Sequence, residues 1–133
     1  MGNIEGFWYG VYHYTEARLA GIPLSFRQNP VAFRVQFVVD QAGTVTGTVA
    51  DEMAYDLPAQ LDGTFDGSAL RFIKRYLNDI GPTGARARPI TYNGALSDDG
   101  TTLSGTWSIR GWFGFLPVTT SGTWEAQRYT PAY

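Results

Sequence analysis

Apolar and polar side chains alternate through most of this chain. In the segment 31–39 every odd position is Val or Phe, whereas Arg34 and Gln36 stand at even positions. Successive side chains of a strand point to opposite faces of a sheet, so the pattern predicts a half-buried strand. Similar alternation predicts eight strands in all, at 6–14, 31–39, 44–51, 59–65, 69–77, 90–96, 103–109 and 118–127.

Tight turns are predicted between several of these strands. The residues 41–43, 66–67 and 97–100 are rich in Gly and Asp, which suit the short links of antiparallel hairpins. Eight strands joined in this way form an antiparallel meander, and eight is a number at which a meander closes into a barrel. The predicted fold class is therefore all-β, an eight-stranded antiparallel up-and-down barrel.

Four segments lose the alternation. They are 16–30, 52–58, 81–89 and 111–117. We predict loops at the first three, with a short helix across a barrel mouth as the alternative for 16–30, and an aromatic connection at 111–117. A ligand is expected to enter the barrel at the end framed by 16–30 and 81–89.

Six glycines lie inside predicted strands, on the face that carries the large apolar side chains. They are Gly10, Gly47, Gly63, Gly94, Gly105 and Gly122. Gly weakens a strand unless a sharp bend or a close backbone approach requires it. Its recurrence here predicts strong coiling of the sheet inside a narrow barrel.

Composition narrows the class of protein. The chain has 133 residues, a net charge of -2 and no Cys. This length predicts one domain, 1–133, and the charge gives no attraction toward nucleic acid or an anionic membrane. The lack of Cys excludes disulfides and favours a cytoplasmic location, with a secreted protein that has lost its signal peptide as the alternative.

Short motifs carry a family resemblance. They are Gly6, Trp8 and Gly10 in the first predicted strand, 45–48 in the third and 61–66 in the fourth. Together with the meander they resemble the calycin group of barrels, which includes lipocalins, fatty-acid-binding proteins, avidins and nitrobindin-type barrels, and the avidin-like pattern is nearest. The resemblance implies that Trp8 plugs one end of the barrel and that the interior holds a small ligand. In lipocalins a basic residue covers this Trp, and Arg128 matches that part.

Other residues depart from these families. Gly10 stands where avidins place an Asn, 73–75 and 92–94 replace their Trp-Lys-Asn and Trp-Ser-Gly, and no Asp follows Trp124. The biotin-site residues are thus missing. Nitrobindin-type barrels bind haem through a His near the C-terminus, whereas the single His of this chain is His13, so haem is not expected either.

Lys74 is the most informative charged residue. It shares a strand face with Phe72 and Tyr76, so its ammonium points toward an aromatic interior. A buried Lys needs an acidic partner or a lowered pKa, and Asp51 is the candidate partner. Such a Lys can bind a carboxylate or enolate, or form a Schiff base. The plainer interpretation is a Lys at the barrel rim whose side chain reaches water, and a register shift of one residue would turn it outward.

The inward aromatic side chains either line a ligand cavity or fill a core, since an eight-stranded barrel has room for both arrangements. Buried Tyr hydroxyls need polar partners, so inward tyrosines would also offer polar contacts to a ligand. The candidate ligand-binding residues are Lys74, Tyr76, Tyr92, Phe72, Trp107, Trp124, Tyr12, Phe37 and Asp51.

His13 shares a face with Phe7, Tyr9 and Val11, and this face points outward in the predicted barrel. An exposed apolar row is typical of subunit contact or of cover by a loop, so a homo-oligomer is one expectation. A structural role for His13 is favoured over a catalytic one.

Asp51, Glu52 and Asp56 follow one another closely, but their spacing fits no calcium-binding loop, so a solvated rim is the simpler interpretation. The chain carries no phosphate-binding loop, dinucleotide fingerprint, metal-binding His pair or nucleophile elbow. One His and no Cys nearly exclude the usual catalytic triads.

The sequence thus predicts a barrel that holds a small, largely apolar molecule, with Lys74 as its polar contact and without a nucleotide or metal cofactor. One alternative is a small barrel enzyme, an isomerase or cyclase that uses Lys74 and Tyr residues as acid or base. The other is a structural or oligomerising barrel with a packed core.

Overall fold

The computed structural model describes residues 3–20, 22–23, 30–51, 59–76, 89–113 and 116–129, without the side chains of 17, 19, 23, 76 and 111–113. These parts of the chain form nine strands and no helix. The strands are β1 (Gly6–Leu19), β2 (Ile22–Pro23), β3 (Val31–Val39), β4 (Thr44–Asp51), β5 (Ala59–Phe65), β6 (Ala69–Tyr76), β7 (Ile90–Leu96), β8 (Thr102–Phe113) and β9 (Leu116–Arg128).

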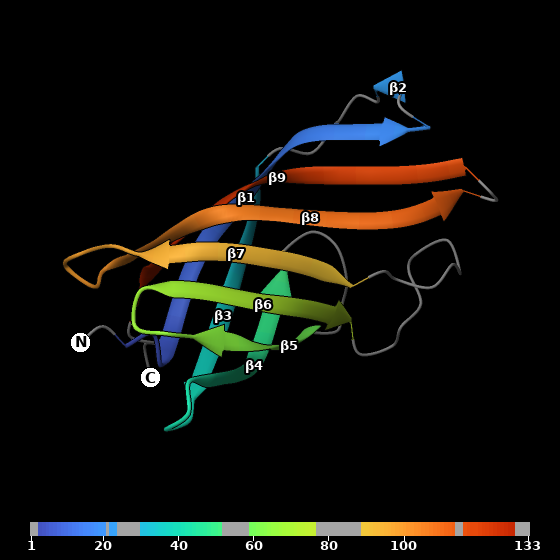
Figure 1. Cartoon of the computed structure of the whole chain (residues 1–133). Helices are drawn as coiled ribbons and strands as arrows, with labels where there is room; N and C mark the ends of the chain where they lie inside the picture. The colour runs from blue at the N-terminus through green and yellow to red at the C-terminus, as the bar shows by residue number, and fades with distance from the viewer. Residues whose placement is uncertain are drawn as a thin grey trace.

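Eight of these strands close into a barrel (Figure 1). From β1 and β3 through β9 each strand pairs antiparallel with the next, and β1 also pairs with β9. This last pairing satisfies the backbone groups that an open sheet would leave at its two edges. The predicted all-β meander barrel is confirmed.

The strand β1 is longer than predicted. The loop or helix expected at 16–30 is wrong for 16–19, which pair with β9 after a bulge at Thr15. It is also wrong for β2, which pairs with the end of β1. The bulge shifts the alternation, whereas the neighbouring strand still offers backbone partners, and these decide the conformation. The segment 24–29 lies outside the described residues.

The aromatic connection predicted at 111–117 is also wrong for most of its length. Gly111 pairs with Val118 and Phe113 with Leu116, so β8 and β9 continue almost to the turn between them. The pairing of β1 with β3 stops at Tyr12, which leaves β1, β8 and β9 to run on together at one end of the molecule (Figure 1).

The predicted hairpin turns are present and are held by Asp side chains. Asp40 Oδ1 accepts hydrogen bonds from the backbone N–H groups of Ala42 and Thr44, each at 2.9 Å. Asp66 Oδ1 does the same for the two residues at 68 and 69, and these bonds lower the pKa of Asp66 because they favour its carboxylate form. Gly67 adopts a positive φ of 102°, which a residue with a side chain rarely adopts.

The inward glycines lie where strands approach most closely, as predicted. A Cβ at Gly105 would lie 1.8 Å from the carbonyl oxygen of Asn93, and one at Gly47 would lie 1.9 Å from that of Gln36. No side chain fits at such a distance, so these positions require Gly. The strong coiling predicted from these glycines stays a prediction.

Trp8 plugs the end of the barrel where β1 begins and β9 ends. Its side chain is fully buried, and its indole Nε1 donates a hydrogen bond to the carbonyl oxygen of Ile4 at 2.8 Å. The Arg128 guanidinium covers the indole at 4.5 Å from the ring centroid and donates to the carbonyl oxygens of Glu5 and Gly100. The basic residue over the Trp that the lipocalin resemblance implied is therefore in place.

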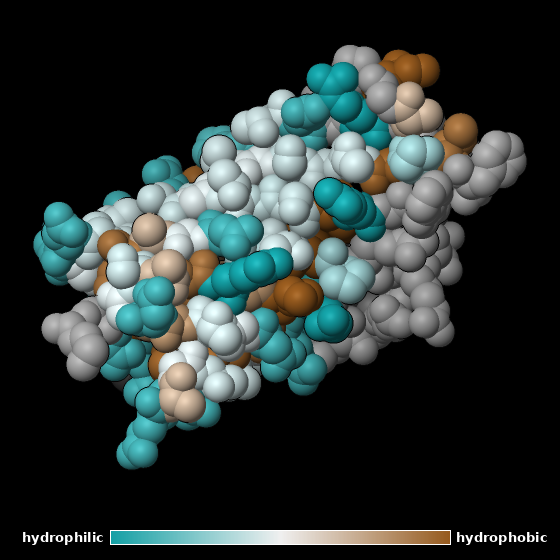
Figure 2. Space-filling view, in the orientation of Figure 1, coloured by the Kyte–Doolittle hydropathy of each residue, from teal (hydrophilic) through white to brown (hydrophobic). Residues whose placement is uncertain are grey.

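The outward row of β1 is only partly exposed. Tyr9 is 49% exposed, and Phe7, Val11 and His13 are partly buried. The ring of Tyr129 lies 5.7 Å from that of Tyr9 and completes a small outer aromatic cluster. The face over β6, β7 and β8 is instead dominated by hydrophilic and neutral side chains (Figure 2). In the described part of the chain no helix could span a membrane.

Candidate functional site

Lys74 lies inside the barrel. The alternation of β6 turns its side chain inward with that of Phe72, and Lys74 is 1% exposed. The rim interpretation, in which the ammonium reaches water, is therefore wrong. The register is fixed by pairing of Lys74 with Leu61 on one side and Ile90 on the other, which leaves no slip that would turn it outward.

Asp51 is the partner of Lys74. Its carboxylate accepts hydrogen bonds from Lys74 Nζ at 3.1 Å and 3.3 Å, and the Asp51 side chain is 2% exposed. The solvated rim predicted for this residue is therefore wrong, because Asp51 ends β4 on the inward face. Glu52 and Asp56 lie outside the described residues.

Two tyrosines flank the ammonium. Lys74 Nζ lies 5.2 Å from the centroid of the Tyr12 ring and 5.4 Å from that of the Tyr92 ring. In the closed strand order β6 lies four strands from β1 in either direction, so Lys74 contacts Tyr12 across the barrel. Aromatic faces attract a desolvated cation, which partly offsets the loss of water around the ammonium.

Next to the ion pair, aromatic rings pack against one another in one cluster. The ring of Tyr92 lies on that of Phe72 at 4.7 Å between centroids, and Phe72 contacts Phe37 at 5.7 Å and Trp124 at 6.1 Å. Four predicted site residues thus meet in the middle of the barrel as core.

The indole N–H groups near the site have structural partners. Trp107 Nε1 donates to the carbonyl oxygen of His13 at 3.2 Å, and Trp124 Nε1 donates to that of Asn93 at 3.0 Å. These bonds join side chains of β8 and β9 to the backbones of β1 and β7. The two indoles therefore offer a ligand their ring surfaces and not a polar contact.

The phenols of Tyr12 and Tyr92 are held in their neutral form. Burial raises the pKa of Tyr12 far above its ordinary value, and the Asp51 carboxylate and a hydrogen bond with Tyr14 raise it further. Burial, followed by the charge of the Asp51 carboxylate, likewise raises the pKa of Tyr92. Near neutral pH both hydroxyls can donate hydrogen bonds but cannot act as bases.

Tyr14 belongs to the site but is absent from the predicted set. Its ring packs on Trp107 at 5.0 Å and on Tyr12 at 5.9 Å. The alternation already places Tyr14 on the face of Tyr12 and could have identified it. Tyr76 is the last residue of β6, two positions beyond Lys74. Its side chain is not among those that the structure describes.

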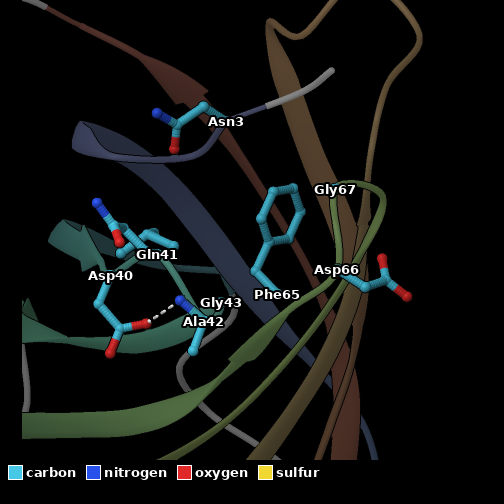
Figure 3. A pocket seen from close by; sticks show the side chains of 9 residues that line it. Asn3, Asp40, Gln41, Ala42, Gly43, Phe65, Asp66 and Gly67 are labelled. Carbon is cyan, nitrogen blue, oxygen red and sulfur yellow. Dashed lines mark hydrogen bonds between the residues drawn. The ribbon is translucent and has the colours of Figure 1, made fainter.

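Two surface grooves lie away from these residues, among the turns that join β3 to β4 and β5 to β6. The groove in Figure 3 is lined by Asn3, Val39, Asp40, Gln41, Ala42, Gly43, Phe65, Asp66 and Gly67. The second groove is lined in part by the same residues, 42–43 and 65–66. The side chains of Asp40 and Asp66 bind the backbone of their own turns there. The described residues include no cluster of three His, Asp or Glu side chains able to hold a metal ion.

A comparison of this chain with protein families, with curated proteins and with solved structures finds no match. The assignment of the site therefore depends on the geometry of Lys74, Asp51 and the tyrosines around them.

Proposed function

We propose that this barrel binds a small, largely apolar molecule in its interior, against the Lys74–Asp51 ion pair and the rings of Tyr12 and Tyr92. The observation that carries the proposal is the ion pair itself, nearly fully buried in an aromatic interior. Concave apolar sites with a few converging polar groups are the usual form of small-molecule sites.

The ion pair has little value as a source of stability. Its formation removes two charges from water, and well-packed apolar residues of similar size often replace such a pair without loss or with a gain. A barrel with a purely structural role therefore gains little stability from Lys74 and Asp51. A binding barrel gains a polar group at a fixed position, which can orient one end of an apolar ligand.

We further infer that the barrel is of the calycin type. The strand order and closure, the plug formed by Trp8 and the guanidinium of Arg128 over its ring support this inference. Many unrelated ligands are bound by such barrels, so the fold alone does not choose among them.

The enzyme alternative receives less support from the site. An isomerase or cyclase would need a group that takes up a proton near neutral pH. Tyr12 and Tyr92 are held protonated by burial and by Asp51, and Lys74 is engaged in the ion pair. Lys74→Met separates the two functions: weaker ligand binding with no turnover to lose supports a binding protein, whereas lost turnover with retained binding supports an enzyme.

Native mass spectrometry of the protein, purified without added ligand or detergent, tests the proposal. We expect a mass above that of the polypeptide, which returns to the polypeptide mass after denaturation. The Lys74→Met variant should carry less of the added mass, and Arg75→Met, a change on the outward face of the same strand, should carry as much as the unaltered protein. A bare polypeptide mass, together with no binding of apolar alcohols in titrations, would refute the proposal. The same spectrum reports the number of subunits.

A further inference from the structure

We infer that the interior site selects an uncharged ligand with one hydrogen-bonding head group, and that Asp51 is the residue that rejects anions. This inference rests on the proposed binding function and adds the chemical class of the ligand. It runs against the simplest interpretation of an inward Lys, which is a receptor for a carboxylate.

The charge of Lys74 is already balanced. Its Nζ lies 3.1 Å and 3.3 Å from the two carboxylate oxygens of Asp51, so the pair presents no net charge. A ligand carboxylate close enough to contact Lys74 would lie within about 5 Å of Asp51. At an effective dielectric constant of about 20, repulsion at this distance cancels more than half of the attraction to Lys74. The small remainder does not offset the cost of taking the carboxylate out of water.

The rest of the described interior offers no second cation to offset this repulsion. Lys74 is the one cation in the buried set of the described chain, and the other members of that set are apolar or aromatic. Arg71 and Arg75 stand on the outward face of β6 and are exposed. An ammonium ligand meets the same difficulty with opposite signs, since repulsion by Lys74 would cancel more than half of its attraction to Asp51 and the remainder would not offset its desolvation.

The neutral groups at the site suit a neutral head group. The hydroxyl of Tyr92 stays protonated and can donate, that of Tyr12 stays protonated in a hydrogen bond with Tyr14, and the carboxylate of Asp51 can accept. An alcohol, ketone or amide can exchange hydrogen bonds with these groups without adding charge to the interior. The aromatic rings around them fit an apolar body, and the indole N–H groups of Trp107 and Trp124 are bound to backbone oxygens.

Three probes with the same eight-carbon chain test the inference: octan-1-ol, octanoate and octylammonium. We expect calorimetric titration of the unaltered protein at pH 7 to show octan-1-ol bound at least about tenfold more tightly than either ion. In Asp51→Asn the charge of Lys74 is unbalanced, so octanoate should become the preferred probe. In Lys74→Met octylammonium should become preferred, because Asp51 is then unbalanced.

Matched changes on the outer face serve as controls. Asp62→Asn and Arg75→Met remove the same charges from exposed positions on β5 and β6, and the preference for octan-1-ol should persist in both. If a single-charge interior variant does not fold, its matching ion should restore the fold as read by near-ultraviolet circular dichroism. Octanoate should do so for Asp51→Asn and octylammonium for Lys74→Met.

The outcomes separate this inference from the proposed function. Binding of octanoate to the unaltered protein as tightly as octan-1-ol overturns the inference and leaves the binding function standing. A preference that Asp51→Asn does not change, or an unfolded Asp51→Asn that octanoate does not restore, overturns it as well. If none of the three probes binds to any variant, the proposed function falls, and the inference falls with it.

Discussion

Removing one partner of the Lys74–Asp51 pair should destabilise the barrel far more than removing both. The shortest contact between Lys74 Nζ and the Asp51 carboxylate is 3.1 Å, which corresponds to about 5 kcal/mol of attraction at an effective dielectric constant of about 20. Lys74→Met or Asp51→Asn leaves the other charge buried, at a cost of about 3–5 kcal/mol. A domain of this size has a total stability of about 5–15 kcal/mol, so either single variant should be only marginally folded.

The double variant Lys74→Met/Asp51→Asn should regain most of this loss, because no unbalanced charge remains. Urea unfolding followed by Trp fluorescence gives the free energies of unfolding for the four proteins of the cycle, and we expect a coupling energy of at least about 2 kcal/mol. The outward variants Arg75→Met and Asp62→Asn should stay within about 0.5 kcal/mol of the unaltered protein. Single-variant losses below about 1 kcal/mol that simply add in the double variant would mean that water reaches the pair, and would refute the account of its burial.

Three further predictions concern the plug, the glycines and the buried phenols. Arg128→Ala removes the cation over the Trp8 indole and its hydrogen bonds to backbone carbonyl oxygens. Urea unfolding should show a free energy of unfolding lower by about 1–3 kcal/mol. A decrease below about 0.5 kcal/mol would contradict the covering role of Arg128. Gly105→Ala should prevent folding or lower the free energy of unfolding by more than about 3 kcal/mol, since its Cβ would lie 1.8 Å from a backbone oxygen. Gly100→Ala has open space around its Cβ but a φ of 75°, so it should cost only about 1–2 kcal/mol. Equal losses in the two variants would count against the close approach at Gly105. Because the pKa values of Tyr12 and Tyr92 are raised in the folded protein, only the unfolded chain loses these phenol protons above pH 10. The free energy of unfolding is therefore unaffected by these groups below about pH 10. As the pH rises further, it should fall by up to about 1.4 kcal/mol per pH unit for each phenol. Absorbance at 295 nm should show two phenols that ionise only on unfolding, and full ionisation in the folded protein would show that they are exposed.

The alternation of side chains was enough to predict the barrel, because closure around a narrow interior makes every strand obey the same inward and outward rule. The same rule placed Lys74 and Asp51 on inward faces. It could not say how deep they lie, since depth depends on how neighbouring strands are staggered, and Lys74 was compatible with a rim position until its pairing with Leu61 and Ile90 was known.

The sequence prediction failed where backbone pairing overrides side-chain pattern. The extension of β1 past Thr15 follows from a bulge that shifts the alternation by one residue. The ends of β8 and β9 were missed because their sequence does not alternate, whereas their backbones pair. The structural hydrogen bond from Trp107 to His13 likewise had no local signal, since the two residues are 94 positions apart in the chain.

The central claim, that a small apolar molecule binds inside the barrel beside Lys74 and Asp51, is tested most directly by isotope-filtered nuclear Overhauser measurements. Unlabelled octan-1-ol is added to labelled protein at saturation. The account predicts contacts from the alcohol to the buried rings of Tyr12 and Tyr92, and none to the outer ring of Tyr9. Contacts confined to the outer cluster around Tyr9, or no contacts to any interior ring, would contradict it.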